Sequence, residues 1–419
     1  MILRHAAFII LFSAIVLQSA LAAEQKTQSL DLLIEEALAN NPRVHSVLNE
    51  WEAAEEKTKQ VAVFPDPIAK YTYIGEPVET KIGPQERKYG LSQKIPFPVK
   101  LGLKTTAQAK HADMLNQKYE AAKREVIKNV KLVYYDLSWT DKAVQVTREE
   151  KTILEGLETV ARRKYESNRT PQQDVIKAQV EITKLINELL ILRRNRKTLK
   201  AKMNSILNRQ EDLPIRTVSD ISAEPFTQKL DDLREMARTS RQELLTAELG
   251  VEKAKYERSL AEFDFVPDVT LGFDYIRVGD GYTNLSNDGN DAWMGTLAIN
   301  VPIWADKVGA HLKEKKAAVK ASILNYEDVK NKVVFNVEDL YFKITTYWET
   351  ILLYENALVP QAEQSFNAAR TGYETGRVDF LNWLDSERML LRTRLAYYRA
   401  ITDYLKSIAL LERAVGQDL

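Results

Sequence analysis

Apolar residues recur at intervals of three, four and seven positions through two long stretches of the chain that lack proline. In the first stretch, no proline occurs between Pro98 and Pro171, and the pattern predicts a helix from about residue 101 to residue 165. At about 1.5 Å per residue this helix would be on the order of 100 Å long, more than one globular domain can use. Its apolar stripe consists of Val126, Val130, Val133, Leu137 and Val144.

The second stretch without proline lies between Pro302 and Pro360, and a turn follows at residues 372–376. The helix after this turn is again amphipathic. Its apolar side comprises Phe380, Leu384, Leu391, Leu395, Tyr398, Leu405 and Ile408. Narrow stripes of this kind are typical of coiled-coil seams rather than of the broad apolar faces in globular cores.

Four short segments alternate apolar and polar residues with the period of two that a β-strand produces. The alternation is clear in residues 268–278 and 292–302 and weaker in residues 68–75 and 86–95. Aromatic residues near strand ends, strands of about ten residues and loops rich in Gly, Asn and Asp suit a transmembrane β-barrel. We therefore predict that these strands span a membrane. The loops at residues 77–85 and 283–291 would lie on the extracellular side.

The two halves of the chain follow one plan, which four pairs of landmarks reveal. They are Leu30 with Leu230, Pro65 with Pro267, Pro96 with Pro302 and Tyr165 with Tyr373, at offsets of 200, 202, 206 and 208. They predict a tandem duplication, with a first repeat at residues 24–208, a connector at residues 209–226 and a second repeat at residues 227–419. Each repeat has a tight turn between helices, which we call the tip, at residues 165–174 and 372–380.

Four strands are too few to close a barrel, and an open sheet edge in lipid leaves unpaired backbone groups that cost several kcal/mol each. About eight strands is the smallest number that closes, and three copies of this chain would supply twelve. The predicted fold class is therefore mainly α with transmembrane β. A tandem-duplicated protomer would contribute four strands to a trimeric, twelve-stranded β-barrel, which long helices would continue as an α-helical coiled-coil barrel.

The first 23 residues combine Arg4, an apolar run and a small-residue ending, which is the pattern of a cleaved secretory signal peptide. Export suits a chain that is built for an outer membrane. The chain contains no cysteine, which excludes a disulfide framework and a lipoprotein anchor. Its 59 basic and 59 acidic residues balance, so composition does not favour a nucleic-acid partner.

The sequence contains no pattern that predicts catalysis. We find no phosphate-binding glycine loop, nucleophile elbow or zinc-protease motif. His45, His111 and His311 are isolated on predicted helices, and the carboxylates follow the polar faces of helices. We therefore expect no enzyme activity, no cofactor and no metal site, and any energy for transport must come from a partner.

Two other classes of protein share some of these features. A periplasmic adaptor also combines a helical hairpin with β-structure, but its hairpin is a single insertion, whereas here the pattern occurs twice. A coiled-coil structural protein would explain the helices but not the strands.

Several motifs together resemble the TolC-type outer membrane efflux proteins over essentially the whole mature chain. The motifs are Asn41 with Pro42, residues 64–67, residues 93–98, residues 301–304 and Tyr373 through Gly376 to Asp385. The resemblance implies a homotrimer in the bacterial outer membrane that extends into the periplasm. It also implies a periplasmic membrane-fusion adaptor and an inner-membrane pump of the resistance-nodulation-division or ABC type.

The wording of residues 95–98 is most similar to the branch that serves metal or drug pumps of the resistance-nodulation-division type. A channel for type I protein secretion is the alternative within the family. The sequence does not identify the transported substrate or the pump.

The resemblance also implies a gate at the periplasmic end, closed by links between a tip aspartate, a tyrosine and an arginine. Asp174 matches the aspartate and Tyr373 the tyrosine. Val378 occupies the arginine's position, with Arg377 next to it. Helix capping by Asp174 and packing by Tyr373 are the alternative roles of these two residues.

A pair of acidic positions forms the narrowest ring in this family, and here Asn382 replaces the first acid while Asp385 matches the second. The ring would carry three carboxylates instead of six, which should weaken its hold on cations. A solvated surface carboxylate is the alternative for Asp385. The residues expected to contact the adaptor are Tyr165, Asn168, Thr375 and Gly376.

Overall fold

The computed structural model describes residues 29–215, 221–281, 286 and 288–419, so the predicted signal segment lies outside the described residues. The chain forms two compact units. The first comprises the described residues of Met1–His45 together with Ala122–Arg241 and Val333–Leu419. The second comprises Ser46–Ala121 and Gln242–Lys332.

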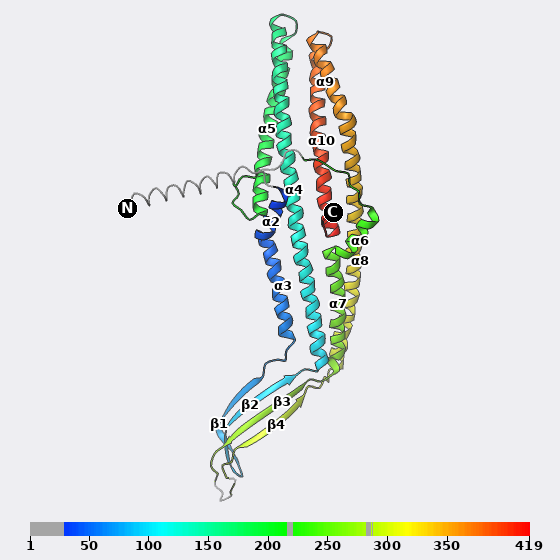
Figure 1. Ribbon diagram of the computed structural model, residues 1–419. Coiled ribbons are helices and arrows are strands. Elements are labelled where there is room, and N and C mark those ends of the chain that lie inside the picture. Colours follow the sequence, from blue (N-terminus) through cyan, green and yellow to red (C-terminus); the bar gives the residue numbers. More distant parts are fainter. Residues whose placement is uncertain (1–28, 216–220, 282–285, 287) are drawn as a thin grey trace, which may run out of the picture. The chain divides into compact units, whose positions relative to one another are not determined.

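Helices and strands alternate in the same order in both halves of the chain (Figure 1). The first half contains helices α2 (Leu30–Asn40) and α3 (Pro42–Val61), strands β1 (Ile68–Thr80) and β2 (Gly83–Ile95), and helices α4 (Pro98–Glu166) and α5 (Gln172–Ile206). The second half contains α6 (Leu230–Ser240), α7 (Gln242–Glu262), β3 (Val269–Val278), β4 (Ala292–Ile299), α8 (Ala305–Leu353), α9 (Val359–Glu374) and α10 (Phe380–Val415). The tandem duplication itself stays a hypothesis.

The helices begin and end at residues whose chemistry explains the boundary. Asn41 precedes α3, and its side chain accepts a hydrogen bond from the Arg43 amide at 3.0 Å, as an N-cap does. Its amide group also donates to the Ile206 carbonyl at 2.8 Å, which ties α3 to the end of α5. Gly416 ends α10 with a φ of 88°, and a Cβ there would lie only 2.3 Å from the Ser240 carbonyl oxygen. Glycine therefore satisfies both the backbone conformation and the close packing.

Helix α8 does not stop at Pro360 but passes into α9 through a π-helical turn, Tyr354–Leu358. Proline has no backbone N–H to donate and its ring crowds the preceding turn, so the wider turn accommodates Pro360 without breaking the helix.

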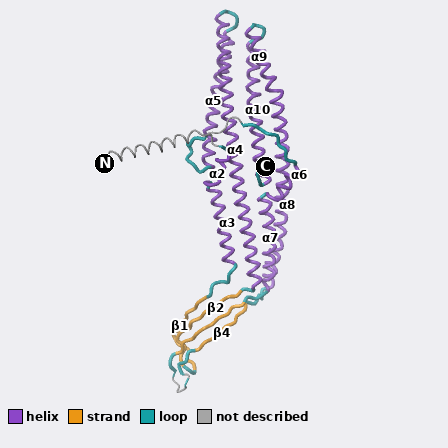
Figure 2. Tube along the Cα trace, in the orientation of Figure 1, coloured by secondary structure: helices purple, strands orange, loops and turns teal. Residues whose placement is uncertain are grey.

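The four strands form one antiparallel sheet in the order β1-β2-β3-β4 (Figure 2). One row of the sheet is aromatic, because Tyr71 pairs with Tyr89, Tyr89 with Tyr275 and Tyr275 with Trp293. All four side chains are exposed, Trp293 to 73%. The other large apolar residues exposed on the strands include Ile68, Tyr73, Leu91, Leu271, Phe273, Leu297 and Ile299.

The expected loop at residues 77–85 is wrong. β1 continues to Thr80 and β2 begins at Gly83, so only two residues connect them. The strands shift register between Tyr73 and Val78, where Gly75 and Pro77 interrupt the alternation, and pairing then resumes. In the second hairpin, residues 283–285 and 287 of the expected loop lie outside the described residues. β4 ends at Ile299, three residues before the expected end.

Each unit has its own apolar packing. In the first unit, buried residues of α4, α5, α9 and α10 form one cluster that includes Leu157, Val175, Phe366, Phe380 and Leu384. In the second unit, Trp51 packs on Ala54, Ala112 and Leu115. The small side chains in this second cluster allow α3 and α4 to approach closely. None of the helices in the described part of the chain contains an apolar stretch of the length and purity needed to cross a bilayer.

Candidate functional site: the tips of the helical hairpins

The first tip joins α4 to α5 through the turn at residues 167–171. The Arg169 amide donates to the Lys164 carbonyl at 2.8 Å, and Asn168 adopts a φ of 54°, which asparagine tolerates better than most residues. Tyr165 is exposed at this turn. Both predicted adaptor contacts on the first tip are thus placed at its outer end.

Asp174 does not cap α5. The N-cap position is occupied by Pro171, and Asp174 lies in the first helical turn, where its carboxylate accepts a hydrogen bond from the Thr170 hydroxyl. A negative charge in the first turn interacts favourably with the helix dipole. The carboxylate is thereby held on the side of the tip that faces Thr170.

The second tip joins α9 to α10. The amides of Arg377 and Val378 donate to the Gly372 carbonyl at 2.7 and 3.1 Å, and Gly376 adopts a φ of 79°. A Cβ on Gly372 would lie 2.4 Å from the Val378 side chain, so a glycine is required under this valine. Thr375 ends α9, and its hydroxyl donates to the Thr371 carbonyl at 2.9 Å.

Tyr373 is buried between the two tips, with only 4% of its surface exposed. Its ring packs against Phe380 and Trp383 at centroid distances of 5.7 and 5.0 Å. The Lys164 ammonium lies 4.2 Å from the ring centroid and also donates to the Tyr373 carbonyl. Lys164 therefore links the first tip to the second, through a cation–π contact and a hydrogen bond.

The Tyr373 hydroxyl lies beside Thr170 and Asp174, and burial raises the pKa of Tyr373. Because the Thr170 hydroxyl already donates to Asp174, the Tyr373 hydroxyl has no well-formed hydrogen bond within the described residues. The structure thus brings Asp174 and Tyr373 together, but through Thr170 rather than in a direct bond. Thr170 and Lys164 were not predicted, because neither stands out in the sequence.

Arg377 does not reach this cluster as an ion-pair partner. It lines a groove along α9 with Thr371, Thr375 and Val378, and among the described residues its guanidinium pairs with no carboxylate. The third member of the expected link is therefore absent from the described contacts.

Asn382 and Asp385 lie on the first turns of α10. Asp379 is the N-cap of this helix, and its carboxylate accepts from the Asn382 amide at 2.8 Å and from the Asn382 side chain at 3.1 Å. Asp385 is exposed but not free, because the Arg388 guanidinium lies 3.1 Å from it and also pairs with Glu181. Arg388 would therefore offset part of the charge that Asp385 brings to a pore.

Two carboxylates contradict the expectation that all acidic side chains lie on polar helix faces. Glu150 on α4 and Glu387 on α10 are exposed to only 0% and 1%. The helical pattern missed them because each position lies on the apolar side of an amphipathic helix.

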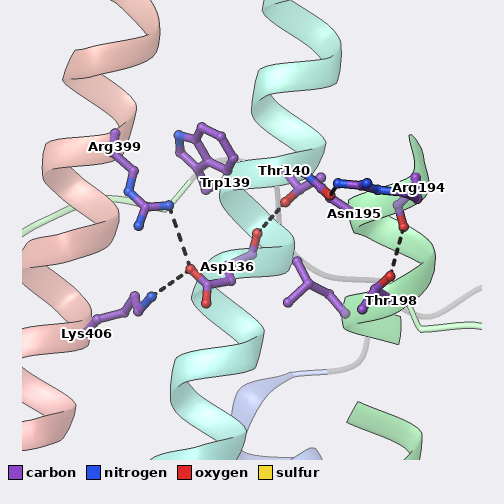
Figure 3. A pocket seen from close by; sticks show the side chains of 9 residues that line it. Asp136, Trp139, Thr140, Arg194, Asn195, Thr198, Arg399 and Lys406 are labelled. Atoms are coloured by element: carbon purple, nitrogen blue, oxygen red, sulfur yellow. Dashed lines mark hydrogen bonds and ion pairs between the residues drawn. The ribbon is translucent and has the colours of Figure 1, made fainter. Parts of the chain in front are cut away.

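A separate cleft farther from the tips lies between α4, α5 and α10 (Figure 3). Its centre is Asp136, which accepts from Lys406 at 2.8 Å and lies 3.9 Å from the Arg399 guanidinium. Arg399 also covers the Trp139 ring at 5.2 Å. Arg194 enters from α5 and donates to Asn195 at 2.9 Å. These contacts join the two hairpins electrostatically.

The histidines have structural partners rather than the isolation that the sequence suggested. His311 lies 2.6 Å from the Asp264 carboxylate, and the His45 ring lies 2.8 Å from the Ala39 carbonyl. Burial lowers the pKa of His111. Within the described residues, no group of three His, Asp or Glu side chains is arranged to hold a metal ion.

Comparisons with known proteins place these features in a family. Residues 233–417 match the model of the outer membrane efflux protein family. The chain is 22% identical over 318 residues to outer membrane protein TolC of Vibrio cholerae serotype O1, covering 73% of this chain and 71% of TolC.

A shorter match of 63 residues, 32% identical, is to the cobalt-zinc-cadmium resistance protein CzcC of Cupriavidus metallidurans, and it covers 15% of each chain. The fold is similar to that of the outer-membrane channel OprN, with a TM-score of 0.80 and 16% identity, covering 92% of this chain and 89% of OprN.

Proposed function

Because the chain belongs to the outer membrane efflux protein family, we propose that it is the outer-membrane channel subunit of a tripartite efflux system. In this proposal the assembled protein is a passive conduit. An inner-membrane pump supplies the energy, and a periplasmic adaptor joins the pump to the tips.

The observation that carries the proposal is the two-faced sheet. One face presents the aromatic row and exposed aliphatic residues such as Leu297, which is 72% exposed. So large an apolar patch is unfavourable in water and suits contact with lipid. The opposite face contains polar groups, among them the Lys88 and Asp274 ion pair at 3.0 Å. A polar face is what the lining of a water-filled barrel requires.

The sheet also supports oligomerisation. β1 and β4 are its edges, and each has hydrogen-bonding groups on one side that no other strand of the chain pairs within the described residues. In lipid those groups must find partners, so a neighbouring copy is the simplest solution. We propose a homotrimer with a closed barrel of twelve strands, continued by the helical hairpins.

The tips fit the periplasmic entrance in this proposal. Asp174, Thr170, Tyr373 and Lys164 would hold the hairpins together in the closed state. Asp385, partly neutralised by Arg388, would set the charge of the constriction. Tyr165, Asn168, Thr375 and Gly376 would contact the adaptor.

For the substrate, we propose metal ions or drugs delivered by a resistance-nodulation-division pump. The match to a cobalt-zinc-cadmium resistance protein supports the metal reading, although it spans only a short stretch. The match to TolC leaves export of proteins through a type I system as the second candidate. The family membership argues against the adaptor and structural-protein readings.

Cysteine cross-linking tests the assembly, because the chain contains no cysteine of its own. Thr72→Cys on β1 would be combined with single cysteines along β4, from Ala292 to Ile299, and the protein oxidised in isolated outer membranes. We expect at least one combination to give covalent dimers and trimers. The control pair, Ser92→Cys with Gly272→Cys, faces each other within one protomer and should give monomers only. Protein that is soluble without detergent, or that never yields species above the monomer, would contradict the proposal.

A further inference from the structure

Glu150 and Glu387 are both buried in the contact between α4 and α10. Their neighbours one turn away include Leu154 on α4 and Trp383 and Leu390 on α10, which belong to the apolar cluster of the first unit. Burial of a carboxylate in such surroundings is costly unless it is paired or neutralised.

The two carboxyl groups lie within hydrogen-bonding reach of each other. As ionised groups they have no donor between them. Among the described residues, both oxygens of Glu150 and one oxygen of Glu387 have no hydrogen-bond partner. A carboxylate can only accept, so a bond between these two side chains requires that one of them carries a proton.

Other charged groups nearby do not replace this proton. Arg394 on α10 lies close enough to favour a negative charge on Glu150, but its guanidinium pairs with Glu363 of α9 at 2.6 Å. Arg388 similarly pairs with Glu181 of α5 and with Asp385. The acidic groups that act against ionisation of the pair are Glu149 on α4 and Glu181 on α5.

We propose that Glu150 and Glu387 share a proton at neutral pH and that this proton fastens the α4/α5 hairpin to the α9/α10 hairpin. The bond is the protonated carboxyl of one residue donating to the carboxylate of the other. Loss of the proton leaves two negative charges facing each other in an apolar contact, and their repulsion loosens it. The inference concerns a contact within one protomer and does not depend on the channel function.

The direction of the pH dependence follows from the pKa values. Burial, and then the bond and charge of Glu150, raise the pKa of Glu387 to about 9, and burial raises the pKa of Glu150 as well. A raised pKa in the folded state means that the contact binds more protons when closed than when open. Its contribution is complete below the ordinary pKa of a glutamic acid, 4.5, declines as the pH rises, and is gone above about 9.

Hydrogen exchange of the full mature chain in detergent tests the proposal. The amides of residues 147–154 and 383–391 would be followed at about pH 6, 7 and 8, with correction for the intrinsic rate of base-catalysed exchange. For one proton, the opening constant of these segments should rise by up to about tenfold per pH unit.

Glu387→Gln should abolish this dependence, because glutamine donates permanently to Glu150 and does not titrate. Glu149→Gln is the matched control, since Glu149 is the exposed neighbour of Glu150, and it should behave like the parent. An unchanged slope in Glu387→Gln, or no slope in the parent, would overturn the proposal.

Infrared spectroscopy of the parent protein provides a test that needs no variant. The band of a protonated carboxylic acid should persist far above the ordinary range of glutamic acid and disappear near pH 9. If no such band is present at neutral pH, the pair holds no proton and the proposal fails.

Discussion

At the scale of single residues, the tips are held by packing around one buried ring. Tyr373 contacts Phe380, Trp383 and Lys164, while its hydroxyl lies beside an occupied Thr170. The ring therefore contributes more to the closed arrangement than the hydroxyl does. This differs from the gate that the family resemblance implied, in which the tyrosine acts through a hydrogen bond.

Two substitutions of Tyr373 separate these contributions. Tyr373→Phe keeps the ring and should change the stability of the first unit by less than about 1 kcal/mol. Tyr373→Ala removes the ring from a buried site and should cost roughly 3 to 5 kcal/mol. The midpoint of thermal unfolding, followed by circular dichroism, would show the difference. Tyr165→Ala, at the exposed tyrosine of the other tip, should shift stability by no more than about 0.5 kcal/mol. Equal losses in the Phe and Ala variants would assign the role to the hydroxyl.

At the scale of elements, one carboxylate organises the junction between the sheet and the helices. Asp268 lies just before β3, 2.9 Å from the Lys100 ammonium on α4 and 3.1 Å from Lys94 on β2. It also accepts from the Phe97 amide at 3.3 Å. Its counterpart in the first half of the chain, Asp66, is exposed. The two halves thus use the same Pro-Asp pair differently.

Asp268→Asn removes the charge from this junction while keeping its shape. We expect a loss of roughly 1.5 to 3 kcal/mol, the typical value of hydrogen bonds to a charged group, seen as a lower midpoint of thermal unfolding. Asp66→Asn is the matched control and should leave the midpoint nearly unchanged. A shift of the same size in both variants would show that Asp268 has no special role at the junction.

Elements whose signal is local could be predicted from the sequence, and contacts between distant residues could not. Proline-free stretches with helical spacing gave α4 and α10, and alternation gave the four strands. The extension of β1 past Glu76 was missed, because the register shift at Gly75 and Pro77 depends on pairing with β2. The contact of Lys164 with Tyr373 joins residues far apart in the chain, so no spacing indicates it. The burial of Glu150 likewise depends on which helix packs against α4.

At the scale of the whole molecule, the sheet and the helical hairpins serve one purpose in our account. The sheet's apolar face requires lipid, its edges require neighbouring copies, and its polar face requires water. The hairpins end in tips that close by local packing, which a partner could rearrange without breaking any long helix. A passive conduit needs nothing more, and no catalytic site is needed to explain the chain.

The recording of single channels in planar lipid bilayers tests this account most directly. Protein purified from outer membranes in detergent should insert and give discrete current steps of uniform size. The same preparation denatured by boiling should give none. Leu297→Asp, which places a charge on the apolar face of the sheet, should insert poorly, because a charged side chain at the lipid face is destabilising. Folded, oligomeric parent protein that inserts but gives no current steps would contradict the claim that the chain forms a channel.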